Sequence, residues 1–155
     1  MGKVTSEKIE DIFNEKTFNT EKEMCNYIEE NIEIFCKDTL EINYISHERE
    51  SYLARGRKFS GNKPHVDFLI KSNNEDYVIV ECKNPRYVYR ENIGALSQIL
   101  DYIRIAENNG YKIKEAWICT SRIKRELCEV IDRFKLPINI CVLNKKNNAI
   151  RKAGE

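Results

Sequence analysis

The chain of 155 residues lacks any long apolar run. Its hydrophobic stretches are far shorter than the roughly 20 residues that a transmembrane helix needs. The first residues, Met1–Glu7, also lack the apolar core of a secretory signal peptide. These absences predict a protein that does not enter a membrane. They also predict a cytoplasmic location, in an intracellular and reducing compartment.

Histidine is scarce, and the usual zinc-binding spacings are missing. His47 and His65 are the only histidines, and no two of the six cysteines form a Cys-x-x-Cys pair. A zinc site of a familiar pattern is therefore not expected. Most of the cysteines fall in apolar helix or strand patterns, which predicts reduced, buried thiols rather than disulfides. The six are Cys25, Cys36, Cys82, Cys119, Cys128 and Cys141.

A strong net charge is also absent. The formal net charge is only +1, so no overall field favours nucleic acid. The local distribution is more informative, because residues 51–66 contain several basic residues and no acidic one. Such a segment can hold phosphate groups, with an ordinary solvated loop as the alternative. The candidate phosphate contacts are Arg55, Arg57, Lys58 and Lys63.

The length predicts a single domain, 1–155, with a core at about 20–143 and a basic tail at 144–155. Apolar spacing predicts the element order α-α-β-β-β-α-β-α-β, hence an α/β protein with a mixed sheet flanked by helices. Helices are expected at 6–16, after a capping box that begins at Thr20, at 92–108 and at 122–134. Strands are expected at 39–46, 64–70, 77–83, 116–120 and 138–143. The stretch 47–63 is expected to be a long loop or a loosely paired hairpin arm, and the tail is expected to be frayed.

The most informative residues lie on the two central strands. Asp67 falls in an apolar run, and Glu81 and Lys83 end the next run. The polar segment 72–76 between the runs predicts a hairpin. Because side chains alternate along a strand, Glu81 and Lys83 project from the same face. Two carboxylates and an ammonium group should therefore converge beside the sheet.

This set of groups suits phosphodiester hydrolysis with a divalent metal. Magnesium prefers oxygen ligands, and we expect them from Asp67, Glu81 and the carbonyl of Cys82. Lys83 would lie near the attacking water, where it helps to deprotonate the water or to stabilise negative charge on the phosphoryl oxygens. The alternative for Glu81 and Lys83 is a cross-strand ion pair at the edge of a sheet, which contributes little energy.

The pattern Asp67…Glu81-x-Lys83 resembles that of the PD-(D/E)XK nuclease superfamily, although Pro64 stands three residues before Asp67 rather than next to it. Gln98 and Tyr102 match the Gln-x-x-x-Tyr element of one branch of that superfamily. On a helix these two residues lie one turn apart on one face. Their alternative roles are a surface polar group and a core aromatic.

The early helix adds to the resemblance, because it is similar to the helix of archaeal and bacterial endonucleases that act on mismatched or branched DNA. Glu21 is the position that matches the helical acid of that family, with Glu30 as the alternative. The resemblance implies a restriction-endonuclease-like fold in which Asp67, Glu81, Lys83, Gln98, Tyr102 and Glu21 form the catalytic site.

The same resemblance implies an endonuclease or exonuclease that hydrolyses DNA and depends on Mg²⁺, with Mn²⁺ as a substitute. DNA is then the partner. A homodimer is compatible with it, because nucleases that cut both strands often pair two active sites. The alternative function is a non-catalytic nucleic-acid-binding or assembly module on the same fold.

Overall fold

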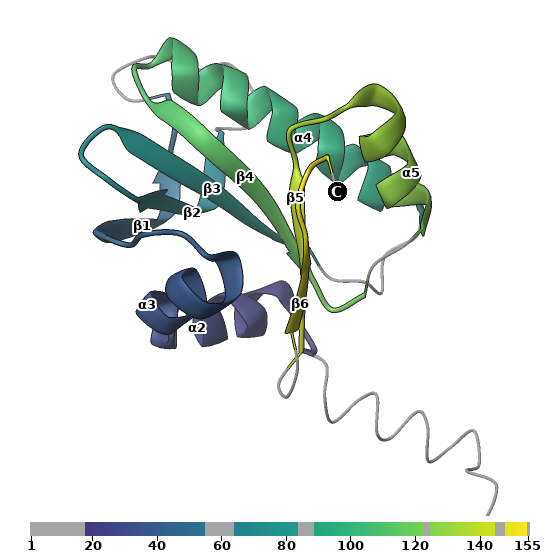
Figure 1. Cartoon of the computed structure of the whole chain (residues 1–155), viewed down its shortest axis with the longest axis horizontal. Helices are drawn as coiled ribbons and strands as arrows, with labels where there is room; N and C mark the ends of the chain where they lie inside the picture. Colours follow the sequence, from purple (N-terminus) through teal and green to yellow (C-terminus); the bar gives the residue numbers. More distant parts are fainter. Residues whose placement is uncertain (1–17, 55–63, 84–88, 123–124, 145–147, 155) are drawn as a thin grey trace, which may run out of the picture.

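The computed structural model describes residues 18–54, 64–83, 89–122, 125–144 and 148–154. These residues form an open six-stranded sheet in the order β1-β2-β3-β4-β5-β6, with helices on both faces (Figure 1). The predicted α/β class is confirmed. The helices are α2 (Glu21–Glu30), α3 (Ile32–Ile34), the π-helix η1 (Phe35–Leu40), α4 (Tyr89–Asn108) and α5 (Arg125–Phe134). The strands are β1 (Ser46–Tyr52), β2 (His65–Lys71), β3 (Asp76–Lys83), β4 (Lys112–Thr120), β5 (Asn139–Leu143) and β6 (Asn148–Arg151).

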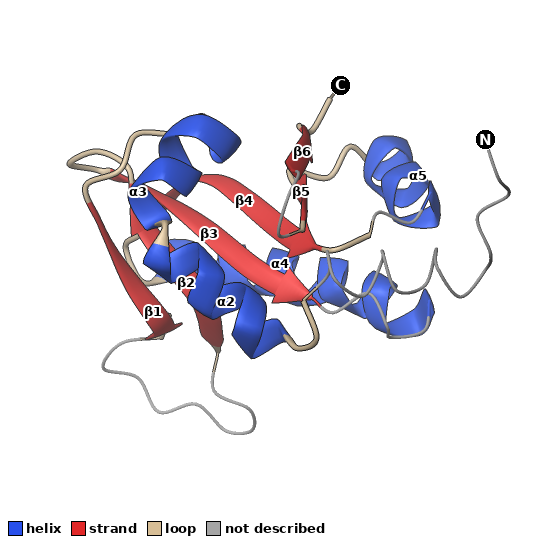
Figure 2. Ribbon diagram, turned by 90° about the horizontal axis from the view of Figure 1, so that it is seen from below, coloured by secondary structure: helices blue, strands red, loops and turns tan. Residues whose placement is uncertain are grey.

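The sheet is mixed, as the element order predicts. β1, β2 and β3 form an antiparallel meander, and β6 is antiparallel to β5. β3, β4 and β5 are parallel, so each connection between them must cross over the sheet. Helices α4 and α5 make these crossovers on one face, whereas α2 and α3 cover the other (Figures 1 and 2).

Two apolar layers follow from this arrangement, one on each face of the sheet. Alternation along β3 divides its side chains between them: Val78, Val80 and Cys82 pack on the α2 side, and Ile79 packs on the α4 side. Both layers are dense with fully buried side chains. The α2 layer contains Met24, Ile28, Phe68 and Trp117, and the α4 layer contains Ile99, Ile118, Ile131 and Ile138.

Helix α2 begins where its capping residues predict. The Thr20 hydroxyl accepts a hydrogen bond from the Glu23 amide at 3.0 Å. The Glu23 carboxylate returns to the amide of Asn19 at 3.1 Å, one residue before the N-cap. Two amides that the helix leaves without intrahelical partners are thereby satisfied. This cap determines where α2 starts, and so where Glu21 lies.

The strand predicted at 39–46 is wrong. Residues Phe35–Leu40 continue the helical segment as a π-helix, and the strand begins only at Ser46. Glu41 ends the helix in a left-handed conformation, with φ of 57°, and the Ile42 amide donates to the Cys36 carbonyl at 2.9 Å. Ile42 therefore returns to the core after a helix end, which produces strand-like alternation in the sequence.

Strand β1 lies at the beginning of the stretch that was predicted as a long loop or a loosely paired hairpin arm. Up to Tyr52 the second alternative is correct, because β1 pairs antiparallel with β2. Its residues Ser46–Tyr52 are mostly polar and mostly exposed or half-buried. As the first strand in the sheet order, β1 pairs only with β2. A strand at an edge can carry charged side chains, so its sequence lacks the apolar alternation of a central strand.

The prediction of a frayed tail is also wrong for residues 148–151, because these residues form strand β6. The Asn148 amide group donates to the Thr39 hydroxyl at 3.2 Å, and Arg151 donates to Asp132 at 2.6 Å. The sheet therefore extends past the predicted core boundary. The helix predicted at 6–16 lies outside the described residues.

All six cysteines lie in described parts of the chain and are free thiols, as predicted. Five of them are buried and Cys128 is half-buried. Among the described helices, none combines the length and the apolar character that crossing a membrane requires.

Two isoleucines in neighbouring helical segments allow a direct test of this packing. Ile28 is fully buried, whereas Ile34 is 63% exposed. We expect Ile28→Ala to lower the free energy of unfolding by roughly 2–5 kcal/mol, because it leaves a cavity in the α2 layer. Ile34→Ala should change it by less than about 0.5 kcal/mol. Urea denaturation of both variants measures the difference, and equal losses would contradict the described orientation of this segment.

Candidate active site

The two predicted acids lie where strands β2 and β3 stop pairing. The register of these strands ends at Phe68 opposite Val80, one residue short of Asp67 and Glu81. Beyond that point, carboxylate side chains accept the hydrogen bonds of the strand amides. The Asp67 amide donates to the Glu81 carboxylate at 2.7 Å, and the Cys82 amide donates to the Asp67 carboxylate at 2.8 Å.

These reciprocal bonds hold both carboxylates inside the protein. Glu81 is only 5% exposed and Asp67 is half-buried. Each carboxylate uses one oxygen for an amide, which leaves Oδ1 of Asp67 and Oε2 of Glu81 outside these bonds. Both oxygens come from hard carboxylate ligands on adjacent strands, which is the donor chemistry that magnesium prefers.

Ionising both carboxyl groups of the pair is unfavourable. Burial, and then the nearby charge of Asp67, raises the pKa of Glu81 to about 8. Burial likewise raises the pKa of Asp67, against the lowering effects of the Cys82 amide and Lys83. Two carboxylates that are forced together in a poorly solvated site favour either a proton or a cation. The donor set therefore fits a divalent metal ion.

Lys83 links the acids to helix α4. Its ammonium nitrogen lies 3.7 Å from Oε2 of Glu81 and donates to Oε1 of Gln98 at 2.8 Å. The Gln98 amide group in turn donates to the Tyr102 hydroxyl at 2.8 Å. The structure thus brings the Glu-x-Lys and Gln-x-x-x-Tyr residues into one hydrogen-bonded chain, which runs from β3 onto α4.

Tyr102 ends this chain as a neutral phenol. Burial, followed by the negative charge of Glu81, raises its pKa to about 12. Its role is therefore to hold Gln98, and through it Lys83, rather than to supply charge. Beside the chain, a hollow of about 580 Å³ provides space next to Gln98. This hollow is lined by Gly94, Ser97, Gln98, Leu100, Asp101 and Arg104.

Helix α2 places Glu21 at the same site. Its negative charge acts to raise the pKa of both Asp67 and Glu81, so it lies near the pair. Glu30 is exposed at the other end of the helix, about 13 Å away along the axis. Of the two alternatives for the helical acid, the geometry therefore favours Glu21.

Sequence reasoning missed Glu50, on β1. It adopts a left-handed φ of 51°, and the β1–β2 register passes from Arg49 opposite Phe68 to Ser51 opposite Val66. Glu50 therefore lies at an irregularity opposite Asp67, and its charge acts to raise the pKa of that residue. No sequence signal predicts it, because glutamate rarely adopts this conformation.

Two side chains of β1, His47 and Arg49, bind an acid of the protein itself. His47 Nε2 lies 2.9 Å from Glu29, and Arg49 donates to the other oxygen of Glu29 at 3.2 Å. The Tyr44 hydroxyl lies 2.7 Å from His47 Nδ1. The hydrogen bond with His47 is the main cause of the lowered pKa of Glu29. This network joins α2 to β1, so both side chains already have a partner within the protein.

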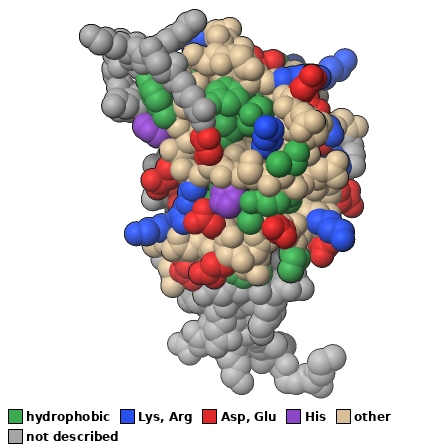
Figure 3. All heavy atoms as spheres, turned by 90° about the vertical axis from the view of Figure 1, so that its left-hand side faces the viewer, with side chains coloured by type: hydrophobic (Ala, Val, Ile, Leu, Met, Phe, Trp, Pro, Cys, Tyr) green, Lys and Arg blue, Asp and Glu red, His purple; other side chains and the backbone are tan. Residues whose placement is uncertain are grey.

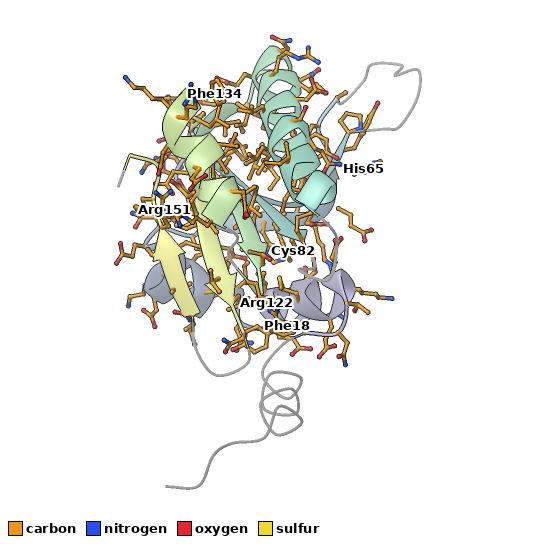
Figure 4. The ribbon with its side chains drawn as sticks, turned by 90° about the vertical axis from the view of Figure 1, so that its right-hand side faces the viewer. Phe18, His65, Cys82, Arg122, Phe134 and Arg151 are labelled. Carbon is orange, nitrogen blue, oxygen red and sulfur yellow. The ribbon has the colours of Figure 1, made fainter. Side chains whose placement is uncertain are left out.

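The predicted phosphate contacts, Arg55, Arg57, Lys58 and Lys63, lie outside the described residues. On the face drawn in Figure 3, acidic and basic side chains are intermixed, and neither sign covers the described surface. Cys82 lies near the end of the sheet between the helical layers (Figure 4). Its amide belongs to the site, whereas its side chain belongs to the α2 layer.

Comparisons with known proteins add no assignment to this geometry. No protein-family model matches the chain, and no curated protein matches it.

Proposed function

We propose that the protein is a metal-dependent deoxyribonuclease with a restriction-endonuclease-like core. One observation carries the proposal: the buried carboxylate of Glu81 and the half-buried carboxylate of Asp67, both of raised pKa, lie together beside Lys83 where β2 and β3 part. A simple ion pair between Glu81 and Lys83 would not require a second carboxylate, that of Asp67, next to Glu81. The resemblance to the PD-(D/E)XK pattern supplies the reaction type.

Asp67 and Glu81 would hold Mg²⁺, and Glu21 lies near enough to add to the negative field. When bound, the ion would polarise the phosphoryl group and favour ionisation of the attacking water. Lys83 would place its ammonium group beside the negative charge that develops on the phosphoryl oxygens. Gln98 would keep Lys83 in place through its 2.8 Å hydrogen bond.

A cleavage panel tests the proposal. Wild type and Glu81→Ala are offered linear, circular, single-stranded, flapped and four-way DNA, with Mg²⁺, with Mn²⁺ and with a chelator. We expect wild type to cut at least one form when either metal is present, and Glu81→Ala to cut none. If wild type binds DNA equally well with and without metal and cleaves no form of DNA, the result would instead favour a non-catalytic module.

Gln98 offers a test of positioning. We expect Gln98→Ala to lower kcat by roughly tenfold with little change in KM, because Lys83 loses the partner that orients it. Ser97→Ala, on the adjacent position of α4, is the matched control and should leave kcat within about twofold of wild type. Single-turnover cleavage separates this effect from product release. Equal rates for the two variants would remove Gln98 from the site.

A further inference from the structure

Four of the five buried thiols of the α2 layer form two pairs. The sulfurs of Cys25, on α2, and Cys82, on β3, lie within 4.8 Å of each other. Cys119, on β4, and Cys141, on β5, are direct partners in the parallel register and form the second pair. Cys82, Cys119 and Cys141 stand side by side in the parallel register. Four cysteines therefore meet in one apolar layer without a disulfide.

Among the described residues, only the pair of Cys25 and Cys82 has a carboxylate oxygen close enough to share an ion with it. A sulfur of Cys25, a sulfur of Cys82 and a carboxylate oxygen of Asp67 all lie within 4.8 Å of one another. Within the described residues, these three side chains are the one group of histidine, cysteine or acidic ligands close enough together to hold an ion. The Cys82 amide binds the Asp67 carboxylate and so keeps it next to the thiols.

The chemistry of this group differs from that of the proposed magnesium site. Thiolates are soft ligands that select zinc-like ions, whereas magnesium takes oxygen. Two sulfurs and one carboxylate oxygen are three of the four ligands of a tetrahedral ion, and a water molecule can complete the shell. Asp67 is half-buried, so an ion can reach the group from its side, although both thiols are buried.

We propose that Cys25, Cys82 and Asp67 form a binding site for a thiophilic divalent cation of the zinc class, with one coordination position open to water. The ligands come from α2, β3 and β2, and they lie 15 to 57 positions apart in the chain. On binding, each thiol that coordinates the ion releases its proton to solvent. The site shares Asp67 with the proposed magnesium site, but it goes beyond the proposed nuclease function and does not depend on it.

Cadmium titration of the purified, metal-free chain under a non-thiol reductant tests this site. We expect wild type to show a thiolate-to-cadmium charge-transfer band in the ultraviolet that saturates at one equivalent. Zn²⁺ should abolish the band by competition. In Cys25→Ala the band should be lost, or its midpoint should shift to a concentration at least roughly tenfold higher. Cys25→Ser, which is nearly isosteric, replaces Cys25→Ala if the alanine variant does not fold.

Cys141→Ala is the matched control, because it removes an equally buried thiol from the pair that has no carboxylate. It should retain the band at the wild-type midpoint. Absence of the band in wild type, or equal loss in Cys25→Ala and Cys141→Ala, would overturn the proposal. Glu81→Gln should retain the cadmium band while losing stabilisation by magnesium. Failure of the thiol site and failure of the nuclease proposal are thus distinguishable.

Discussion

Replacement of Lys83 by alanine is expected to reduce metal-dependent DNA cleavage by roughly 100- to 10,000-fold. The ammonium group lies 3.7 Å from Glu81 and is held by Gln98, so it occupies one position beside the two acids. Removing it takes away a cation that would stabilise the developing phosphoryl charge, while the candidate metal ligands remain. The measurement is single-turnover cleavage of the form of DNA that wild type cuts best.

Binding must be measured beside the rate. Lys83→Ala should keep DNA affinity within about threefold of wild type, because a single ammonium group contributes little to a contact with many phosphates. Lys71→Ala, at the end of β2 that lies away from the site, is the matched control. It should leave both the cleavage rate and the DNA affinity unchanged. Cleavage by Lys83→Ala at the wild-type rate would refute the assigned role. A parallel loss of affinity would make Lys83 a binding residue.

Glu81→Gln is expected to stabilise the metal-free protein at pH 8 by roughly 2–4 kcal/mol relative to wild type. The pKa of Glu81 is raised from 4.5 to about 8 by burial and by Asp67. Ionising this carboxyl group therefore costs more in the folded protein than in the unfolded chain. The glutamine carbonyl can still accept the Asp67 amide, so the variant removes the charge and keeps the bond.

The direction of the pH dependence follows from the raised pKa. Between about pH 4.5 and pH 8 the folded protein keeps the Glu81 proton, whereas the unfolded chain releases it. The contribution of this proton to stability is thus complete below about pH 4.5 and is lost as the pH rises towards 8. The difference in unfolding free energy between wild type and Glu81→Gln should grow over this range. Urea denaturation at pH 5 and pH 8 measures it.

Metal should reverse the effect. At pH 8, Mg²⁺ or Mn²⁺ should stabilise wild type, because the ion binds the ionised carboxylates of the folded state only. The metal should stabilise Glu81→Gln far less than wild type at pH 8. It should also stabilise wild type far less at pH 5 than at pH 8. Glu107→Gln, which removes a charge from the exposed surface of α4, is the control and should follow wild type throughout. An identical response to pH and metal in wild type and Glu81→Gln would contradict the described environment of Glu81.

Local physical rules explain what was predictable in the fold. Asp67 and Glu81 could be placed on paired strands because two apolar runs flank a turn, and strand alternation then put Lys83 on the face of Glu81. The cap at Thr20 similarly located the start of α2. These features depend on neighbours within a few residues, so they are readable from one sequence. The segment 39–46 misled because a helix end that returns Ile42 to the core produces the same alternation as a strand.

Features that depend on how separate elements meet could not be predicted in this way. Glu50 approaches Asp67 only because β1 departs from regular pairing there. Cys25 reaches Cys82 only because α2 packs against the end of β3. Strand β6 has four residues, none of them fully buried, and it is held by partners as remote in sequence as Thr39. No local pattern encodes any of these contacts.

The sequence by itself determined the α/β class, the hairpin that carries Asp67 and Glu81, and the pairing of Gln98 with Tyr102 on one helix face. Tertiary structure alone decided that the two carboxylates accept amides of the neighbouring strand, that Lys83 reaches Gln98, and that the charge of Glu21 acts on both carboxylates. The reason is the range of the interactions. Alternation and capping act within one element, whereas burial and charge repulsion, which raise the pKa of both acids, arise only when β2, β3, α2 and α4 pack together.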